Sequence, residues 1–390
     1  ASAKPRDENF YQNPYSFYDR ARAGGSLFRW TDYDLICATS ADAVGSILRD
    51  RRFGRETPPE AMQPVPDHVA PFYAVEAHSM LELEPPRHTR LRGLVLRAFT
   101  SRRIAALGPE IAALSHELID RFPRREIDLL PCFARPLPVI IIARLLGVPE
   151  GRANDLLAWS NAMVGMYRAG RSRGIEDAAV AATLAFTDFL TGYIAEKRQR
   201  PADDLITHLI AAEAEGERLS TDELISTCIL LLNAGHEATV HTIGNGVKTL
   251  IEAGIGDEAL TPDRVDATVE EILRFDPALH MFTRWAYEDV QVGGHVFRRG
   301  DRVGCLLAAA NRDPAVWTDP NRFDPARPVR PHSSFGAGLH FCVGAPLARL
   351  ELQIALPILF DRLPGLRIAG TPRYADVYHF HGLERLVLAR

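Results

Sequence analysis

The sequence predicts a mainly α-helical protein with a minor β region. Apolar residues recur at helical spacing over most of the chain from about Pro86 onward, whereas strand-like runs are short and scattered. The chain has 390 residues, of which 46% are hydrophobic, and no shift in composition marks a linker between two cores. We therefore expect a single domain over residues 1–390, with a β-containing N-terminal lobe and a larger helical lobe.

The predicted helices are bounded by capping residues and by the ends of the apolar periodicity. Thr261-Pro262, for example, combines an N-cap residue with a proline in the first turn, where proline is tolerated. Helices are expected over residues 87–98, 103–122, 136–146, 152–166, 175–199, 203–214, 221–253, 262–275 and 345–362. Strands are expected over residues 27–30, 35–38, 290–292, 295–297, 302–306 and 386–388.

The stretch from residue 56 to residue 86 is rich in proline, which prevents a regular helix over most of it. Ordered loops of this length are uncommon unless they cover or shape a site. Two interpretations stay open: a loop that faces a substrate and a flexible linker.

Charge and cysteine content exclude several classes of function. The net charge is −5 with both signs interspersed, so there is no nucleic-acid footprint. The five cysteines are odd in number and widely spaced, which argues against a disulfide framework, a zinc knuckle and covalently attached c-type haem. No run approaches the ~18 apolar residues of a membrane span. We expect a soluble, cytoplasmic protein that binds neither nucleic acid nor a membrane.

Cys342 lies in a glycine-rich loop, residues 335–345, directly before a predicted helix. A cysteine at a helix N-terminus meets unsatisfied N–H groups and the positive end of the helix dipole, which favour the thiolate that ligates metals. Gly336 and Gly338 permit a tight turn beside a flat cofactor, and Phe335 and Phe341 supply apolar walls. A lone cysteine is usually a small buried apolar residue, so Cys342 alone does not indicate a metal ligand and the whole motif has to be considered.

The helix predicted over residues 221–253 is unusual in its middle. It opens with Ser220-Thr221-Asp222-Glu223, which has the form of a capping box, and its length is roughly 50 Å. Gly235 costs about 1 kcal/mol relative to alanine, and Glu237 in an apolar interior costs more unless it is hydrogen-bonded. By themselves these residues indicate either a kink with a satisfied glutamate or a functional interruption.

Taken together, the residues of the cysteine loop resemble the haem-binding signature of the cytochrome P-450 superfamily, in which the cysteine is the axial iron ligand. The matching positions are Phe335, Gly336, Gly338, His340, Cys342, Gly344, Leu347, Ala348 and Arg349. The resemblance covers nearly the whole chain. It implies the cytochrome P-450 fold of the soluble bacterial type, with haem b ligated by Cys342 and the long central helix crossing the buried haem.

The same resemblance assigns the middle of the long helix to oxygen binding and proton delivery. Ala234 and Gly235 correspond to the pair that opens room beside the iron, and Glu237 to the acid that relays protons. The sequence departs from the family at Ala238, where a threonine normally follows the acid. Thr239 is one residue, or about 100°, further round the helix, so it does not simply replace the missing hydroxyl. Three explanations for proton delivery without the threonine stay open: an ordered water replaces its hydroxyl, a substrate hydroxyl does so, or the oxidation needs little proton relay.

Further motifs would support the haem. Glu271 and Arg274 match the family's buried Glu-x-x-Arg pair in form and order. The haem propionates need cationic or hydrogen-bonding partners. By resemblance, these partners are His88, Arg92, Arg284 and His340.

The resemblance also places the substrate pocket and the electron donor. Expected pocket segments are the proline-rich loop and residues 163–168, 234–238, 278–282 and 377–380, with His280 and Tyr167 as polar anchors. The chain has no dinucleotide fingerprint or flavin domain, so electrons are expected from a ferredoxin served by a ferredoxin reductase. The basic residues of this chain that are expected to dock the ferredoxin are Arg97, Arg102, Arg103 and Arg349.

The sequence therefore predicts a monomeric haem-thiolate monooxygenase that uses O2 to oxidise a small organic substrate. One alternative is a peroxide-driven haem-thiolate enzyme, which Ala238 favours and Glu237 disfavours. Another is a haem-based sensor without turnover, which Glu237 and the long pocket loop disfavour.

Overall fold

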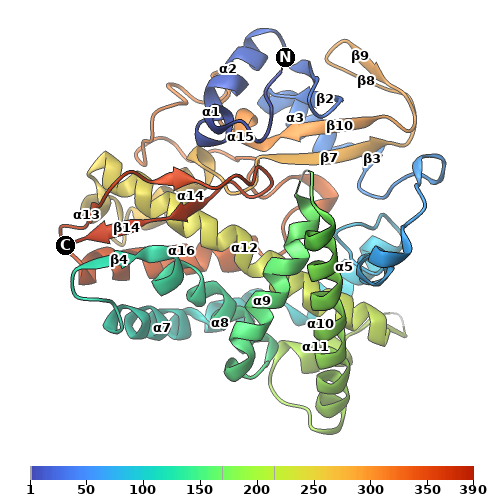
Figure 1. The fold of residues 1–390 in the computed structure, drawn as a ribbon, viewed down its shortest axis with the longest axis horizontal. Helices are drawn as coiled ribbons and strands as arrows, with labels where there is room; N and C mark the ends of the chain where they lie inside the picture. The colour runs from blue at the N-terminus through green and yellow to red at the C-terminus, as the bar shows by residue number, and fades with distance from the viewer. Residues whose placement is uncertain (1, 169, 215) are drawn as a thin grey trace. The chain divides into compact units, whose positions relative to one another are not determined.

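The computed structural model describes residues 2–168, 170–214 and 216–390, and it is mainly helical with small sheets (Figure 1). The chain divides into two compact units. The first unit contains the chain up to Ala61, Ala112–Arg135 and Ala238–Arg390, and the second contains Met62–Ile111 and Pro136–Glu237. The long helix α12 (Thr221–Ala253) is continuous and contributes residues to both units.

The largest sheet belongs to the first unit and has the strand order β1-β2-β10-β7-β3. Its strands are β1 (Leu27–Trp30), β2 (Leu35–Ala38), β10 (Arg302–Leu306), β7 (Met281–Ala286) and β3 (Phe53–Gly54). Strand β10 pairs in parallel with β2 and antiparallel with β7, with Val303 opposite both Ile36 and Arg284. Apolar residues of α3 (Ala41–Arg49), chiefly Val44 and Ile47, pack with this sheet into one buried cluster.

The remaining elements of the first unit flank the sheet or follow it in sequence. The helices are α1 (Glu8–Gln12), α2 (Tyr15–Ala23), most of α7 (Gly108–Asp120), α13 (Gly256–Ala259), α14 (Val265–Phe275), α15 (Leu307–Ala310) and α16 (Ala345–Arg362). The short strands are β4 (Glu126–Asp128), β8 (Val290–Val292), β9 (His295–Phe297), β11 (Arg367–Ile368), β12 (Arg373–Tyr374), β13 (Leu383–Arg385) and β14 (Val387–Ala389).

The second unit is almost entirely helical. Its helices are α4 (Ala70–Glu76), α5 (Arg87–Ala98), α6 (Ser101–Ala106), α8 (Pro136–Leu146), α9 (Ala153–Val164), α10 (Arg173–Gln199) and α11 (Leu205–Ala211). Helix α10 is long and apolar enough to cross a membrane by length and composition. Its Phe186, Leu190 and Ile194 are wholly buried, and it packs against α9 and α4, so these apolar side chains serve core packing.

Most predicted elements are confirmed, some to the residue. The helices at 87–98, 136–146, 221–253 and 345–362 have the expected bounds, and the capping box is present: Ser220 Oγ accepts from Glu223 N at 3.1 Å, and Glu223 Oε2 accepts from Ser220 N at 2.9 Å. The single helix predicted over 103–122 is wrong, because the chain turns at Leu107 and forms α6 and α7 separately. Sequence periodicity did not identify α1, α2, α3, α4 or strand β7.

Candidate active site

The loop that carries Cys342 is closed by its own backbone. Cys342 N donates to Phe335 O at 3.0 Å, and helix α16 begins three residues later at Ala345. Gly344 is the N-cap residue of α16, and its carbonyl accepts from Ala348 N at 3.0 Å. Cys342 is half-buried and forms no disulfide within the described residues. The predicted position of this thiol at a helix N-terminus is confirmed.

Glycine is required in this loop for two separate reasons. Gly336 and Gly338 have φ values of +71° and +70°, which side chains rarely adopt. In addition, a Cβ at Gly338 would lie 2.4 Å from the carbonyl oxygen of Leu48, the last leucine of α3. A Cβ at Gly336 would lie 3.2 Å from Phe282 on strand β7. The loop is therefore pressed against both α3 and β7.

Arg349 and Glu270 hold the aromatic wall of the loop. Arg349 lies 4.8 Å over the ring of Phe335 and donates to both carboxylate oxygens of Glu270, at 2.5 and 3.1 Å. His332 Nε2 lies 3.0 Å from Glu270 Oε2. Burial alone would raise the pKa of Glu270, but the hydrogen bonds from His332 and Arg349 outweigh it and hold that pKa at about 2. Glu270 is therefore an ionised anchor for the start of α16.

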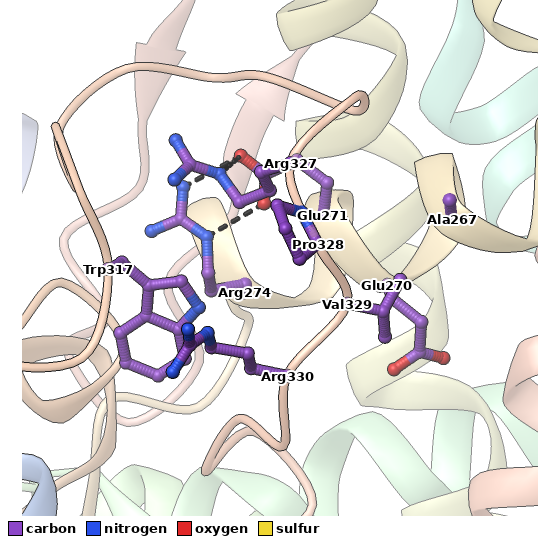
Figure 2. A pocket seen from close by; sticks show the side chains of 9 residues that line it. All are labelled: Ala267, Glu270, Glu271, Arg274, Trp317, Arg327, Pro328, Val329 and Arg330. Carbon is purple, nitrogen blue, oxygen red and sulfur yellow. Dashed lines mark hydrogen bonds and ion pairs between the residues drawn. The ribbon is translucent and has the colours of Figure 1, made fainter.

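The Glu-x-x-Arg pair is buried, as predicted. Arg274 Nη2 and Nε donate to the two oxygens of Glu271, each at 2.7 Å, and both side chains are at most 3% exposed. Figure 2 shows these hydrogen bonds, with Arg327 beside Glu271 and Trp317 beside Arg274. Arg327 Nε donates to Glu271 Oε1 at 2.9 Å, so one buried carboxylate holds two guanidinium groups.

This pair connects directly to the cysteine loop. Arg274 Nη1 donates to the carbonyl of Asn311 at 3.0 Å. The side chain of Asn311 in turn accepts from Ser333 N at 2.7 Å and donates to Ser334 Oγ at 2.8 Å, just before the loop begins. The buried charge pair thus fixes the approach of the chain to Cys342.

The pocket drawn in Figure 2 belongs to this structural network. Its volume is about 10 Å³, room for one water molecule, so it is not a substrate pocket. It is lined by Ala267, Glu270, Glu271, Arg274, Trp317, Arg327, Pro328, Val329 and Arg330.

The four predicted propionate partners fall into two pairs, one in each unit. In the first unit, Arg284 on β7 is 3% exposed, and His340 ends the short turn Gly338–His340. Arg284 is two residues beyond Phe282 and shares its face of the strand, next to the cysteine loop. In the second unit, His88 and Arg92 lie at i and i+4 on α5, and His88 is 1% exposed. Their common role with the haem stays a prediction.

Helix α12 is continuous through the unusual run at residues 233–239. Gly235 packs against α8: a Cβ there would lie 3.3 Å from Ile142 Cγ1. Ala234 is exposed. The glycine thus permits close helix packing, which the sequence alone did not indicate.

His236 is a site residue to which sequence reasoning gave no role. It is 1% exposed, and its Nδ1 lies 2.7 Å from the carbonyl of Leu232, to which it must donate because a carbonyl only accepts. Its Nε2 lies 3.3 Å from Glu237 Oε1. The signal available in the sequence was the direct adjacency of a histidine to the acid.

The residues after Glu237 begin the part of α12 that belongs to the first unit. Thr242 donates to the carbonyl of Ala238 at 2.7 Å, and Thr239 is buried at 5% exposure. Because Thr239 follows Ala238 directly, its side chain leaves a different face of the helix. The family's hydroxyl is therefore not restored at position 239.

The predicted polar anchors of the pocket both have hydrogen-bond partners within the protein. His280 is wholly buried with its Nδ1 2.8 Å from Tyr18 Oη, and its role in the substrate pocket stays a prediction. The hydroxyl of Tyr167 donates to Glu76 at 3.1 Å within the second unit. Met163 and Met166 are buried at 1% and 4% exposure, as expected for core packing.

Comparisons with known proteins agree with this geometry. A family model described as Cytochrome P450 matches residues 264–363, which contain the Glu271–Arg274 pair and the Cys342 loop. The biotin biosynthesis cytochrome P450 of Bacillus subtilis (strain 168) is 36% identical over 387 residues, covering 97% of this chain and 96% of the relative. Cytochrome P450 monooxygenase PikC of Streptomyces venezuelae is 36% identical over 380 residues, covering 94% and 87%.

A solved structure matches over almost the same length. The crystal structure of P450BioI in complex with hexadec-9Z-enoic acid ligated acyl carrier protein has a TM-score of 0.91 and 34% sequence identity, and the match covers 98% of this chain and 99% of that chain. The chain belongs to the cytochrome P450 family, has its fold, and is, like the monooxygenases among its relatives, an oxidoreductase that incorporates oxygen.

Proposed function

We propose that Cys342 is the axial ligand of a haem b and that the chain oxidises an apolar biosynthetic intermediate. The observation that carries the haem assignment is the position of the Cys342 thiol in a glycine loop at the start of α16, held by the buried Glu271 and the partly buried Glu270. The residues present fit a haem. The sulfur of Cys342 suits its iron, and the two histidines and two arginines predicted as propionate partners suit its two propionate groups. When bound, the haem supplies oxygen binding and oxygen transfer.

The test of this assignment is the absorption spectrum of the reduced, carbon monoxide-bound protein. Wild type should show the red-shifted Soret band of thiolate ligation, and Cys342→Ser should lose it. Cys132→Ser is the matched control, because Cys132 is also half-buried and lies outside the loop. A wild-type protein that is folded and takes up haem but lacks this band would overturn the assignment.

Proton delivery is assigned to Glu237 with His236 as its positioning residue. His236 Nε2 lies 3.3 Å from Glu237 Oε1, so the imidazole would orient the carboxylate that passes the proton. Ala238 leaves space where the family has a hydroxyl, so a water or a substrate hydroxyl would complete the path to the reacting oxygen. The chain's contribution is thus to orient the carboxylate and to exclude bulk water around it.

A substrate with a long apolar chain is the proposed class, presented free or on a carrier protein. Support comes from the relatives: one acts in biotin biosynthesis, and a close structural neighbour was solved with an acyl-loaded carrier protein. The test is a haem spin-state titration with free fatty acids of graded length, with an acyl carrier protein bearing the same acyl groups, and with macrolides as the control class. A response to macrolides alone would reject the acyl class.

Electrons are proposed to come from a ferredoxin and its reductase. Arg97, Arg102 and Arg103 on the second unit and Arg349 on the first are the candidate docking cations. Arg102 is exposed, whereas Arg349 is engaged with Glu270 and Phe335, so Arg102→Ala is the cleaner test. The rate at which ferredoxin reduces this variant should fall at low salt.

Turnover with hydrogen peroxide and none with ferredoxin would favour the peroxide-driven alternative. A single domain, a monomeric state and a cytoplasmic location belong to the same proposal.

A further inference from the structure

A buried cluster of metal-ligating side chains lies in the first unit, among residues to which the haem proposal gives no role. Asp276, His280 and His381 each offer one ligand atom, and these atoms lie within 4.8 Å of one another. The three residues are 5%, 0% and 2% exposed. Asp276 and His280 come from the segment between α14 and β7, and His381 from the segment between β12 and β13. The backbone already joins the two segments, because His381 N donates to the carbonyl of Ala278 at 2.7 Å.

Two nitrogen atoms in this cluster are buried without a hydrogen bond. Within the part of the chain that the structure describes, neither His280 Nε2 nor His381 Nε2 has a hydrogen-bond partner. His381 Nε2 lies 3.4 Å from Asp276 Oδ1. His280 uses its other nitrogen, Nδ1, for Tyr18 Oη, so Nε2 is the atom left for a ligand. Buried polar atoms are nearly always paired, so the unpartnered Nε2 of His280, beside the His381–Asp276 contact, points to a missing partner.

Tyrosine hydroxyls surround the cluster as outer partners. Tyr15 donates to Asp276 Oδ1 at 2.5 Å, and Tyr374 donates to Asp276 Oδ2. Tyr18 contacts the nitrogen of His280 that faces away from the cluster. Metal-ligating histidines and carboxylates typically have such outer hydrogen bonds, which fix the ring and the carboxylate in the ligating orientation.

We propose that Asp276, His280 and His381 form a structural zinc site. Two imidazole nitrogens and one carboxylate oxygen are typical zinc ligands, and a water would complete a tetrahedron. Such a tetrahedron separates its ligand atoms by about 3.3 Å, so the cluster needs only a modest contraction from its present spacing. The ion would clamp the segment before β7 to the segment between β12 and β13. The proposal does not depend on the haem assignment.

The test is the zinc content of the full-length, haem-loaded protein. Protein from zinc-supplemented cultures, dialysed against a weak chelator, should retain about one zinc per chain by mass spectrometry. The zinc X-ray absorption edge should show nitrogen and oxygen neighbours with imidazole scattering and no sulfur. His280→Ala and His381→Ala should each reduce the zinc content about tenfold or more. His295→Ala is the matched control, since His295 is an exposed histidine of strand β9.

Three results would overturn the proposal. The first is wild-type protein without stoichiometric zinc, a measurement that needs no variant and so does not depend on variant folding. The second is a sulfur neighbour at the zinc edge, which would move the metal to a cysteine. The third is zinc that persists in both histidine variants, which would mean adventitious surface binding.

Discussion

Arg274 and Glu271 face each other through two hydrogen bonds of 2.7 Å in a setting almost without solvent. Removing one member of such a pair leaves the other charge buried and unpaired, which costs about 3–5 kcal/mol. Here the loss would also release Asn311 and, through it, the backbone at Ser333 that leads into the cysteine loop.

We expect Glu271→Gln to lower the free energy of unfolding by about 3 kcal/mol or more and to weaken haem retention. Urea unfolding followed by circular dichroism and by haem absorbance would measure both. Glu258→Gln is the control: Glu258 lies 3.9 Å from Arg264 in an exposed pair, so its loss should change stability by less than about 1 kcal/mol. Equal effects of the two substitutions would contradict the structural role of the buried pair.

Gly338→Ala should destabilise the cysteine loop far more than an ordinary glycine substitution. A Cβ at this position would lie 2.4 Å from Leu48 O and the residue has φ of +70°. Gly365→Ala separates the two causes, because Gly365 has φ of +74° with nothing within 4 Å of its Cβ position. The control should lose about 1 kcal/mol of unfolding free energy from backbone strain alone, and Gly338→Ala clearly more, together with haem. A loss at Gly338 no larger than at Gly365 would rule out the steric contribution.

Acid should destabilise the fold through Glu270. Its pKa is about 2 in the folded chain against an ordinary value of 4.5, so its contribution to stability is complete above pH 4.5 and is lost as the pH falls toward 2. After allowance for partial solvent screening, we expect about 2 kcal/mol of stability to disappear over this window. Unfolding titrations at several pH values would measure the slope, and Glu270→Gln should flatten it. A Glu270→Gln slope equal to that of wild type would argue against this assignment.

Ala238→Thr should raise the fraction of consumed NADH that appears as oxidised product. The added hydroxyl would follow Glu237 directly, where the family carries one, and would replace an exchangeable water in the proton path.

Glu237→Gln should lower turnover by about tenfold or more while leaving the spin-state titration with substrate unchanged. Thr239→Ala, on a different helix face, serves as the control and should change neither quantity. A decrease in coupling for Ala238→Thr would mean that the alanine makes room for a substrate hydroxyl.

Positioning of Glu237 by His236 can be measured by its effect on pH dependence. His236→Gln keeps a polar side chain but removes the imidazole that faces Glu237 Oε1. We expect the pH profile of turnover to shift, because the contact that orients the carboxylate is lost. Retention of the wild-type profile at reduced overall activity would instead indicate a purely structural role for His236.

The long helices could be predicted because their signals are local. The capping box of α12 and the prolines before α5 lie in the sequence itself, and the structure places these helices at the predicted bounds. Strand β7 was missed because its burial follows no simple alternation: five strands share its sheet, and tertiary pairing with β10 and β3 decides its conformation.

The site residues divide in the same way. Cys342, Glu271 and Arg274 are recognisable because their motifs resemble those of the family, and the helix start at Cys342 and the burial of the pair match the expectation. The contacts of His280 with the hydroxyl of Tyr18 and of His236 with the carbonyl of Leu232 were not predicted, because spacing does not show these partners. Side-chain contacts between distant segments are fixed by packing, so only the folded structure could reveal them.

Because Gly338 lies so close to Leu48, the position of helix α3 limits the position of the loop that carries the Cys342 thiol. Leu48, near the beginning of the chain, limits how closely the loop of residues 335–345 can approach α3. It therefore also limits where the sulfur of Cys342 can lie. Substitutions along α3 that shift this helix by a fraction of an ångström would therefore change the position of the Cys342 thiol without altering any side chain in the loop.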